Sequence, residues 1–285
     1  MGAEIIYGKE LAQELRLNMK QEVSKLKEQG IIPKLTVILI GEDPASKSYV
    51  KGKQKASDFV GVDADLIELP NETSEQTLLE LIDKLNQDQT VNGILVQLPL
   101  PKHIEEQTII EAIDPSKDVD GFHPISVGRM LTGKDTFLPC TPFGIITMLK
   151  SKDITIEGKH AVIVGRSNIV GKPVGQLLLN ENATVTYCHS RTNNMDELIK
   201  MADILIVAVG KETFIHGDQI KEGAIVVDVG VNRNESGKLV GDVHFDSAKE
   251  KASYITPVPG GVGPMTITML LHNTIQSAKS AHAKG

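Results

Sequence analysis

Tyr49 and Lys53 lie four residues apart in a segment, Ser46 to about Val60, that predicts a helix, so their side chains should share one face. A lysine in a cleft near a cationic cofactor would have a lowered pKa, which suits it to exchange protons near neutral pH. An ordinary solvated helix face is the alternative, because three further lysines lie nearby: Lys47, Lys51 and Lys55. This segment alone leaves a catalytic lysine and a solvated helix both open.

Two other segments place polar side chains where ligands could bind. The apolar run 91–98 predicts a strand in which Gln97 comes just before a proline break. Ligands of open α/β sheets bind beyond the carboxyl ends of strands, so Gln97 could orient a substrate or a water, or could simply cap the strand. In the segment 114–122, Asp118 and Asp120 lack the further oxygen ligands of a calcium loop. One of these carboxylates could instead pair with N–H donors of a heterocycle.

A run of prolines and glycines, 257–264, is too unusual for a simple turn. Glycines there allow φ values that other residues avoid, and the prolines stiffen the chain around them. The run predicts a loop against a flat ligand, with Pro259, Gly260 and Gly261 at its centre.

The stretch 160–192 predicts one strand–turn–helix–strand unit of the kind that binds phosphate. Gly165 allows a sharp turn, and Gly171 and Gly175 allow close approach of the backbone to a ligand or a neighbouring strand. The N-terminus of the following helix favours an anion. The spacing departs from G-x-G-x-x-G because Ser167 stands at the second position.

The second strand of this unit predicts NADP rather than NAD. NAD-binding units usually carry an acid at this strand tip for the ribose 2′-hydroxyl, but here the tip carries Ser190 and Arg191. A hydroxyl and a guanidinium could bind a 2′-phosphate, and Arg166 in the turn adds a second cation. The alternative is that Arg191 is an ordinary surface arginine.

The order of predicted elements gives an α/β protein of two domains. Helices and strands alternate over the first 120 residues, which predicts a largely parallel, helix-covered sheet. We expect an N-terminal three-layer α/β domain at 1–140 and a Rossmann-type NADP-binding domain at 141–265. The last helix, which has no strand after it, should pack back on the first domain, so that 266–285 joins it. Residues 114–142 read as irregular, and Ser46 and the pair Thr73/Gln76 as helix caps.

Composition excludes several classes of protein. The chain has 285 residues and a net charge of −7, which disfavours a general nucleic-acid binder. Its two cysteines, Cys140 and Cys188, show no metal-site spacing, and no metal is expected. The chain has no secretory segment and no apolar run long enough for a membrane span. We therefore expect a cytoplasmic protein.

Six ordered motifs resemble the bifunctional methylenetetrahydrofolate dehydrogenase/methenyltetrahydrofolate cyclohydrolase family. They are YVKGKQKA at 49–56, GILVQLPLP at 93–101, DPSKDVDGFHP at 114–124, PCTPFGI at 139–145, GRSNIVGKPVG at 165–175 and TPVPGGVGPMT at 256–266. The resemblance implies oxidation of 5,10-methylenetetrahydrofolate to 5,10-methenyltetrahydrofolate with NADP, then hydrolysis to 10-formyltetrahydrofolate, which supplies one-carbon units. It also implies a homodimer packed through its nucleotide domains.

The resemblance also implies roles for single residues. Lys53 resembles the catalytic lysine, Gln97 its amide partner, Asp120 the carboxylate that holds the pterin, and Tyr49 the aromatic residue beside the folate. Ser46 resembles a further cleft residue. The loop Pro259–Gly261 resembles the family's stretch along the folate.

The cofactor residues match in the same way. Gly165, Arg166 and Ser167 match the phosphate turn, and Ser190 and Arg191 match the end that binds the 2′-phosphate. Val231 matches a backbone contact near the nicotinamide, where many relatives carry isoleucine.

Two other functions stay open at this point. One is a monofunctional NADP-dependent dehydrogenase of another small substrate, with no hydrolytic step. The other is a nucleotide-binding protein that has lost its chemistry, although the matching polar positions at 49, 53, 97 and 120 are all present.

Overall fold

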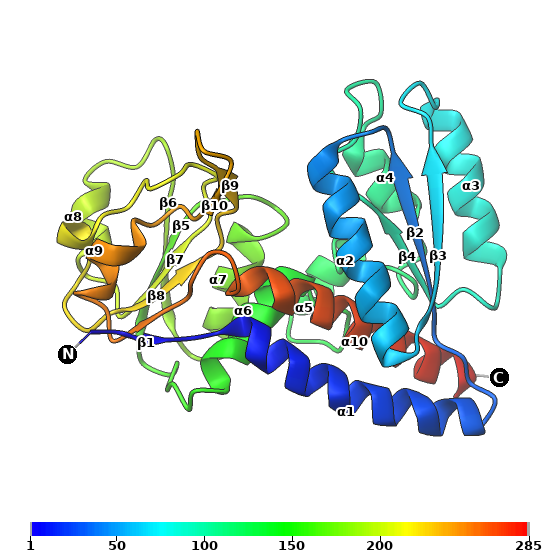
Figure 1. The fold of residues 1–285 in the computed structure, drawn as a ribbon, viewed down its shortest axis with the longest axis horizontal. Helices are drawn as coiled ribbons and strands as arrows, with labels where there is room; N and C mark the ends of the chain where they lie inside the picture. The colour runs from blue at the N-terminus through cyan, green and yellow to red at the C-terminus, as the bar shows by residue number, and fades with distance from the viewer. Residues whose placement is uncertain (1, 284–285) are drawn as a thin grey trace. The chain divides into compact units, whose positions relative to one another are not determined.

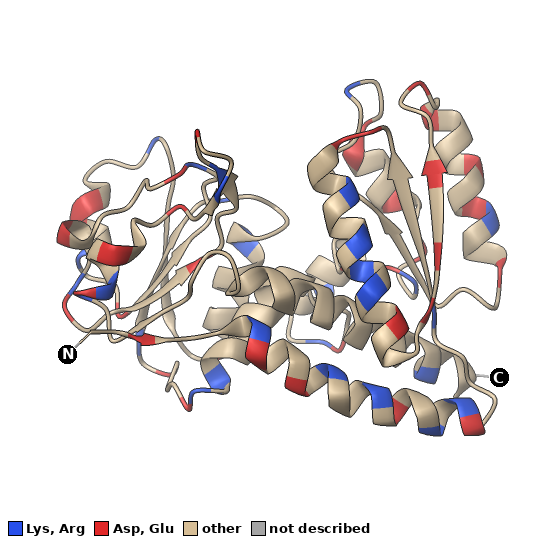
Figure 2. Ribbon diagram, in the orientation of Figure 1, with Lys and Arg blue, Asp and Glu red and all other residues tan. Residues whose placement is uncertain are grey.

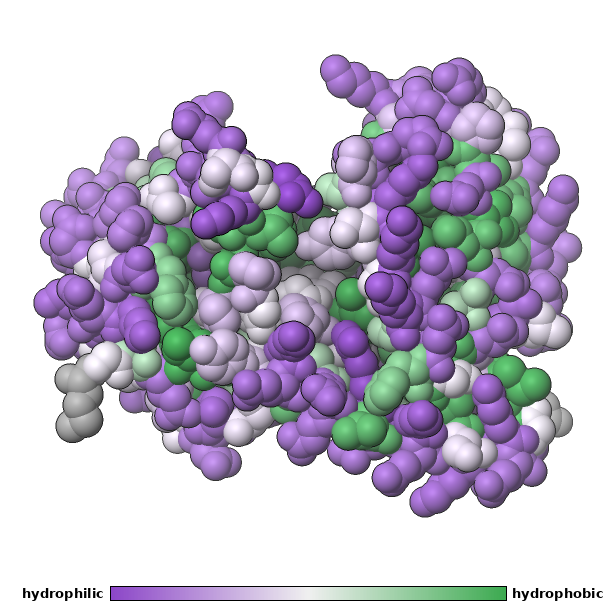
Figure 3. Space-filling view, in the orientation of Figure 1, coloured by the Kyte–Doolittle hydropathy of each residue, from purple (hydrophilic) through white to green (hydrophobic). Residues whose placement is uncertain are grey.

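A computed structural model of the chain describes residues 2–283 and divides into two compact units. Unit 1 contains the chain up to Gln13 together with Thr141–Thr266, and unit 2 contains Glu14–Cys140 together with the chain from Ile267 onward. Figure 1 shows the elements of both units, and in Figure 3 polar residues cover most of the visible surface of each. The fold is a two-domain α/β architecture, as the sequence predicts.

Unit 2 is built on a three-stranded parallel sheet in the order β3-β2-β4. The strands are β2 (Lys34–Ile40), β3 (Asp63–Leu69) and β4 (Gly93–Val96). Helices cover the sheet, and Figure 1 shows α2 to the left of β2 and β3 and α3 to their right. These helices are α2 (Pro44–Val60), α3 (Glu75–Gln87), α4 (Glu106–Ala112) and α5 (Pro124–Leu131). Apolar residues of β2 and β4 pack against α3 and α4, among them Ile38, Ile94, Ile82 and Ile109.

Unit 1 is built on a six-stranded sheet in the order β1-β11-β8-β7-β5-β6, in which every pair is parallel. Its strands are β1 (Glu4–Ile5), β5 (His160–Val164), β6 (Thr184–Cys188), β7 (Ile204–Val207), β8 (Ile225–Asp228) and β11 (Tyr254–Ile255). The remaining elements are α6 (Cys140–Lys150), α7 (Gly171–Asn180), α8 (Met195–Ile199), η1 (Gly217–Gln219), α9 (Phe245–Lys249) and the hairpin β9 (Asn232–Arg233) with β10 (Leu239–Val240). The central strands are buried on both faces, as parallel strands covered by helices must be.

The C-terminal helix packs against unit 2, as the sequence predicts. α10 (Val262–His282) begins in unit 1 and belongs to unit 2 from Ile267 onward. The Asn273 amide donates to the carbonyl oxygens of Val119 at 2.8 Å and Leu138 at 3.0 Å. Ser277 donates to the carbonyl oxygens of Asn92 and Ser116. These bonds satisfy backbone oxygens around the segment that carries Asp118 and Asp120.

The N-terminus departs from the expected domain boundary. The expected first domain begins at residue 1, but β1 pairs with β11, with Glu4 opposite Tyr254, and the chain up to Gln13 therefore groups with unit 1. Such a pairing joins positions about 250 residues apart, which no local pattern reveals. The long helix α1 (Gly8–Glu28) then continues into unit 2.

Three local expectations were also wrong. The segment 114–142 is not irregular throughout, because α5 forms there behind Pro124, with the His123 ring accepting from the Ile125 N–H. Asp43, rather than Ser46, caps α2 by accepting from the Ser46 N–H at 2.7 Å. Ser74, rather than Thr73, caps α3. In the two capping cases a nearby residue of comparable capping ability occupies the cap position, and spacing alone cannot choose between them.

Candidate active site and nucleotide site

Lys53 is a buried lysine of unit 2. Its side chain lies on the inner face of α2, with 7% of the residue exposed. Its ammonium Nζ donates to Gln97 Oε1 at 2.9 Å, and Gln97 Nε2 in turn donates to the carbonyl oxygen of Leu98 at 2.7 Å. Because the Leu98 carbonyl holds the amide NH₂, the Gln97 oxygen faces the lysine. The residues just after β4 thus position the Gln97 oxygen as the acceptor for Lys53.

Burial and neighbouring charges shift the pKa values around Lys53 in opposite directions. Burial lowers the pKa of Lys53, while the attraction of Asp120 and a smaller effect of Cys140 raise it. Burial raises the pKa of Asp120, while Lys53 and a hydrogen bond from Cys140 lower it. Burial also raises the pKa of Cys140 well above its usual value, so this residue stays a neutral thiol. The pKa of Lys53 is therefore lowered and that of Asp120 raised, so the two values lie closer together than they do in water.

Asp118 and Asp120 have different partners. Asp118 is 2% exposed, and its carboxylate accepts from the Phe122 and His123 N–H groups and from the Ser126 hydroxyl. Its oxygens are occupied by its own loop. Asp120 is partly exposed and belongs to the Lys53 group, so of the two carboxylates it is the one left for a ligand.

Burial raises the pKa of Asp118 to about 6, because its three donors only partly offset the loss of solvation. An acid whose folded pKa lies above its unfolded pKa contributes stability that is lost as the pH rises through the folded value. We therefore expect the free energy of unfolding of the wild type, relative to Asp118→Asn, to fall by about 3 kcal/mol between about pH 4 and about pH 7. Urea denaturation at several pH values would measure this difference.

Asp114→Asn is the matched control for that experiment. Hydrogen bonds from Ser116 lower the pKa of Asp114, so its contribution should be present at neutral pH and lost in acid, which is the opposite trend. A difference between the wild type and Asp118→Asn that does not change with pH would contradict the assigned environment of Asp118.

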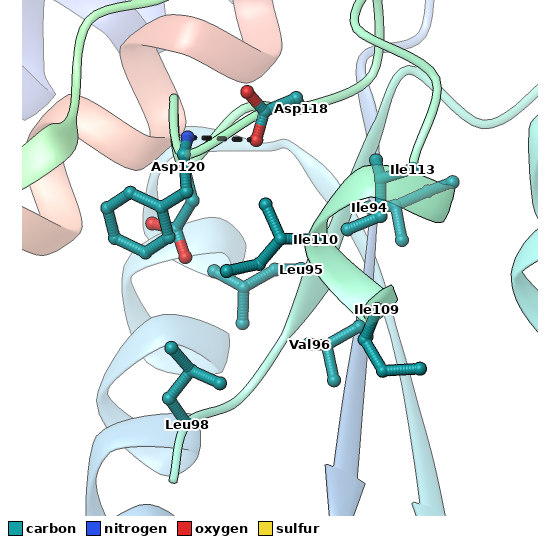
Figure 4. A pocket seen from close by; sticks show the side chains of 10 residues that line it. Ile94, Leu95, Val96, Leu98, Ile109, Ile110, Ile113, Asp118 and Asp120 are labelled. Atoms are coloured by element: carbon teal, nitrogen blue, oxygen red, sulfur yellow. Dashed lines mark hydrogen bonds between the residues drawn. The ribbon is translucent and has the colours of Figure 1, made fainter. Parts of the chain in front are cut away.

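A small pocket lies beside the two aspartates. Its volume is about 20 Å³, which is room for about one water molecule. Figure 4 shows apolar side chains from β4 and α4 on its walls, among them Leu95, Val96 and Ile110, with Asp118 and Asp120 at one end. A cavity of this volume has no room for a ring, so a ligand of Asp120 does not bind inside it.

Tyr49 and Ser46 lie on the same helix as Lys53, one and two turns before it. Tyr49 is 37% exposed, and burial of its ring raises the pKa of its phenol, which therefore stays protonated. Ser46 is buried, whereas Lys51 and Lys55 are exposed on the outer face of α2, along which Figure 2 shows a row of basic residues. The helix therefore has both of the faces that the sequence left open: an inner face with the buried Lys53, and an outer face with lysines exposed to solvent.

The predicted phosphate turn in unit 1 lies between β5 and α7. Gly165 has a φ of +133°, and a Cβ there would overlap the carbonyl oxygen of Ala208. A Cβ on Gly171 would lie 2.7 Å from the carbonyl oxygen of Gly165. The Ser167 hydroxyl accepts from the N–H groups of Val170 and Gly171. The turn is therefore a cradle that only glycines permit, and it leads into the N-terminus of a ten-residue helix, as binding of a pyrophosphate requires.

The tip of β6 presents the two residues predicted for the 2′-phosphate. Ser190 and Arg191 are both exposed. The turn that carries them is held locally, because His189 Nδ1 accepts from the Arg191 N–H and Thr192 Oγ1 accepts from the His189 N–H. Arg166 is exposed on the phosphate turn. These residues fit NADP: two guanidinium groups and a hydroxyl lie at the carboxyl ends of the neighbouring strands β5 and β6.

The remaining predicted positions also lie in unit 1. Val231 is 47% exposed beyond the end of β8. The loop that carries Pro259, Gly260 and Gly261 follows β11; Gly260 has a φ of +100°, and its carbonyl oxygen accepts from the Lys9 N–H.

Four polar residues of these sites were not predicted as functional. Cys140 lies beside Asp120, Asn273 holds the loop of Asp120, and two buried aspartates, Asp228 and Asp242, hold loops in unit 1. Gly230 and Gly241 pack directly on the two aspartates, because a Cβ on Gly230 would overlap the Asp242 carboxylate and a Cβ on Gly241 that of Asp228. Within residues 2–283, no three side chains of His, Cys, Asp or Glu are grouped to hold a metal ion. No helix in this range has the length and hydropathy needed to cross a membrane.

Comparisons with known proteins identify the family of both units. Residues 6–120 match the catalytic domain of tetrahydrofolate dehydrogenase/cyclohydrolase, and residues 139–282 match its NAD(P)-binding domain. The chain is 68% identical to bifunctional protein FolD of Bacillus anthracis over 281 residues, which covers 99% of this chain and 98% of that relative.

Solved structures are similar over the same length. The bifunctional enzyme FolD, methylenetetrahydrofolate dehydrogenase/cyclohydrolase, from Campylobacter jejuni superposes with a TM-score of 0.96 at 51% identity, covering 98% of this chain and 99% of that one. The Trypanosoma brucei methylenetetrahydrofolate dehydrogenase-cyclohydrolase, complexed with NADP cofactor and inhibitor, gives 0.95 at 37% identity, covering 99% of each chain. The chain therefore belongs to the tetrahydrofolate dehydrogenase/cyclohydrolase family.

Proposed function

We propose that the chain oxidises 5,10-methylenetetrahydrofolate to 5,10-methenyltetrahydrofolate with NADP and hydrolyses that product to 10-formyltetrahydrofolate. The observation that carries the proposal is the buried Lys53, whose Nζ donates to Gln97 Oε1 and whose pKa is lowered by burial, with Asp120 nearby. A dehydrogenase that only transfers a hydride has no need of this proton-exchanging group. The phosphate turn on the same chain supplies the other activity.

In the dehydrogenase step the chain mainly binds and orients. A hydride leaves the methylene bridge of the folate for NADP, which supplies the acceptor when bound. The turn Gly165–Ser167 and the N-terminus of α7 would hold the pyrophosphate, and Ser190 and Arg191 the 2′-phosphate. Asp120 would accept hydrogen bonds from the pterin, and Tyr49 would lie beside its ring. No strong base is required, because the folate nitrogen supplies the electrons.

In the cyclohydrolase step Lys53 moves a proton. Water attacks the methenyl carbon, and neutral Lys53 accepts a proton from this water at Nζ. The carbon–nitrogen bond then breaks, and Lys53 returns that proton to the leaving nitrogen. The hydroxyl on the former methenyl carbon releases its remaining proton to solvent as it becomes the formyl carbonyl, which gives 10-formyltetrahydrofolate. Gln97 keeps Nζ in place through its oxygen. Burial supports this role, because it lowers the pKa of Lys53 and so raises the neutral fraction.

Absorbance during turnover tests the proposal. Wild-type protein is given 5,10-methylenetetrahydrofolate with NADP, then with NAD, and afterwards methenyltetrahydrofolate alone. Reduction of NADP together with accelerated loss of the methenyl species is the expected result. Reduction without that acceleration would leave a monofunctional dehydrogenase, and no reduction with either cofactor would refute the enzyme proposal.

Replacement of Arg191 should identify the cofactor's phosphate site. A charge-assisted hydrogen bond contributes about 1.5–3 kcal/mol, so Arg191→Ala should raise the KM for NADP about 10–100-fold. The rate with NAD should change little, because NAD lacks the 2′-phosphate. Arg129→Ala is the control, since the Arg129 guanidinium is engaged with the Asp135 carbonyl in unit 2. An equal rise in KM for both cofactors would contradict the assignment.

We further propose that the chain works as a homodimer packed through unit 1, in a reducing, cytoplasmic setting. β6 is an edge strand of the unit 1 sheet, and Tyr187 on it is 39% exposed, which leaves an edge that a second copy could cover. Cys140 and Cys188 are both free thiols. Analytical ultracentrifugation would give the oligomeric state, and a monomer at micromolar concentration would contradict the dimer.

A further inference from the structure

Asp242 is a fully buried carboxylate that holds two loops of unit 1. Its exposed fraction is 0%. Its oxygens accept from three consecutive N–H groups, those of Val209 at 2.7 Å, Gly210 at 2.9 Å and Lys211 at 2.9 Å, in the loop that follows β7. They also accept from the side-chain amide of Asn232 at 2.9 Å, just after β8. One side chain therefore sets the path of the chain after two neighbouring strands.

Asp228 holds the backbone of Asp242 in position through hydrogen bonds. Asp228 is the last residue of β8, and its carboxylate accepts from the N–H groups of Gly230, Asp242 and Val243, each at 2.9 Å. Its own N–H donates to Thr256 Oγ1 at 2.8 Å, where the loop after β11 begins. The two aspartates therefore connect the loops after β7, β8 and β11 into one network.

Burying two carboxylates costs desolvation free energy, which indicates a function beyond filling the core. Among residues 2–283 no salt bridge involves either aspartate, so N–H donors alone compensate two buried acids. Burial and the charge of Asp242 raise the pKa of Asp228 to about 6. Apolar residues of similar size would avoid this desolvation. Apolar residues could not fix three loops, however, because they accept no hydrogen bonds.

The loops lie where the second half of a dinucleotide must go. The strand order is β8-β7-β5-β6 with all strands parallel, so the loops after them lie along one edge of the sheet. The phosphate turn follows β5, and the residues for the 2′-phosphate follow β6. A cofactor with its adenosine side over β6 extends its other half over β7 and β8. Val231 lies there, exposed, between Gly230 and Asn232, which the two aspartates hold.

We propose that Asp242 is a positioning residue for NADP: it fixes the loops after β7 and β8 in the shape that receives the nicotinamide end, without touching the cofactor. This inference rests on the proposed function. It assigns a role in hydride transfer to an acid about 190 residues from Lys53 in the chain and in the other unit.

Asp242→Asn tests the role with nearly unchanged volume. An amide offers one acceptor oxygen, and its NH₂ would face N–H donors, so at least one of the two loops should be released. Titration calorimetry should show the dissociation constant for NADP raised about tenfold or more, which corresponds to loss of about 1.4 kcal/mol. Hydrogen exchange at the amides of Val209–Lys211 should become faster. Hydrolysis of methenyltetrahydrofolate should stay within about twofold, because Lys53, Gln97 and Asp120 all lie in unit 2.

Asp203→Asn is the matched control. Asp203 accepts the His160 N–H at 2.9 Å just before β7, at the amino-terminal edge of the same sheet. It should reduce stability without changing the dissociation constant for NADP. A milder variant, Asn232→Ala, removes one donor and leaves Asp242 in place, and it should raise that constant about threefold.

The outcomes separate the proposals. If Asp242→Asn and Asn232→Ala both bind NADP as the wild type does, Asp242 is a brace for stability and the inference is wrong. If Asp242→Asn does not fold, Asn232→Ala decides alone. A wild type that neither binds nor reduces NADP would instead refute the proposed function itself.

Discussion

Replacement of Lys53 by glutamine is expected to slow hydrolysis of methenyltetrahydrofolate by about 10²–10⁴-fold, the usual contribution of a positioned acid–base group. Glutamine can still donate to Gln97 Oε1, but it cannot take a proton from water. The fold should survive, because glutamine keeps the hydrogen bond to Gln97, and Asp120, which loses its cation, is partly exposed and can protonate. NADP binding should be unchanged, since Lys53 lies in unit 2 and the phosphate turn in unit 1.

The pH profile gives an independent readout for Lys53. Because burial lowers its pKa, the wild-type rate of hydrolysis should rise with pH through a pKa below the usual lysine value and then level off. Lys53→Gln should lose this ionisation. Lys55→Gln, on the exposed face of the same helix, is the control and should retain both rate and profile. A Lys53→Gln variant with full hydrolytic activity would refute the assigned base and favour a monofunctional dehydrogenase.

Gly165→Ala should have the largest effect on stability among the glycine positions of the phosphate turn. Its φ of +133° disfavours any side chain, and a Cβ would overlap the carbonyl oxygen of Ala208, which is backbone and cannot turn aside. Overpacking and backbone strain together should cost about 4 kcal/mol of the free energy of unfolding. Calorimetry should show a lower Tm for unit 1, and any folded protein should bind NADP more weakly because the turn must open.

Gly158→Ala separates backbone strain from overlap. Gly158 also has a positive φ, +73°, and lies in the same unit, but nothing lies within 4 Å of the position its Cβ would take. This variant should lose only about 1 kcal/mol. Equal Tm values for Gly165→Ala and Gly158→Ala would show that the close contact with Ala208 has no energetic weight.

The elements themselves were predictable because their causes are local. The strand β2 is a run of apolar residues after Pro33, and α3 has apolar residues at helical spacing. The phosphate turn was predictable for the same reason, since Gly165 and Gly171 meet within six residues of each other. Roles for Lys53, Gln97 and Asp120 came from motif resemblance, and local reasoning alone left a solvated helix and a capped strand open.

Choices between equivalent residues required the tertiary structure. Asp118 and Asp120 are identical in type and two residues apart. The Asp118 oxygens accept hydrogen bonds from Phe122, His123 and Ser126, so Asp120 is the carboxylate we expect to bind a ligand. The sequence cannot make this choice, because it depends on how the chain turns after residue 118.

The sequence by itself determined the two-domain α/β plan and the glycine turn after β5, since the elements and the turn follow from residues close together in the chain. It also predicts the 2′-phosphate residues Ser190 and Arg191 at the tip of β6. Only the tertiary structure decided that β1 pairs with β11, that Asn273 holds the loop of Asp120, and that Asp242 among 37 acidic residues holds the loops after β7 and β8. These are contacts between distant segments. Burial and hydrogen-bond partners, which set the pKa and the role of each side chain, exist only once those segments have met.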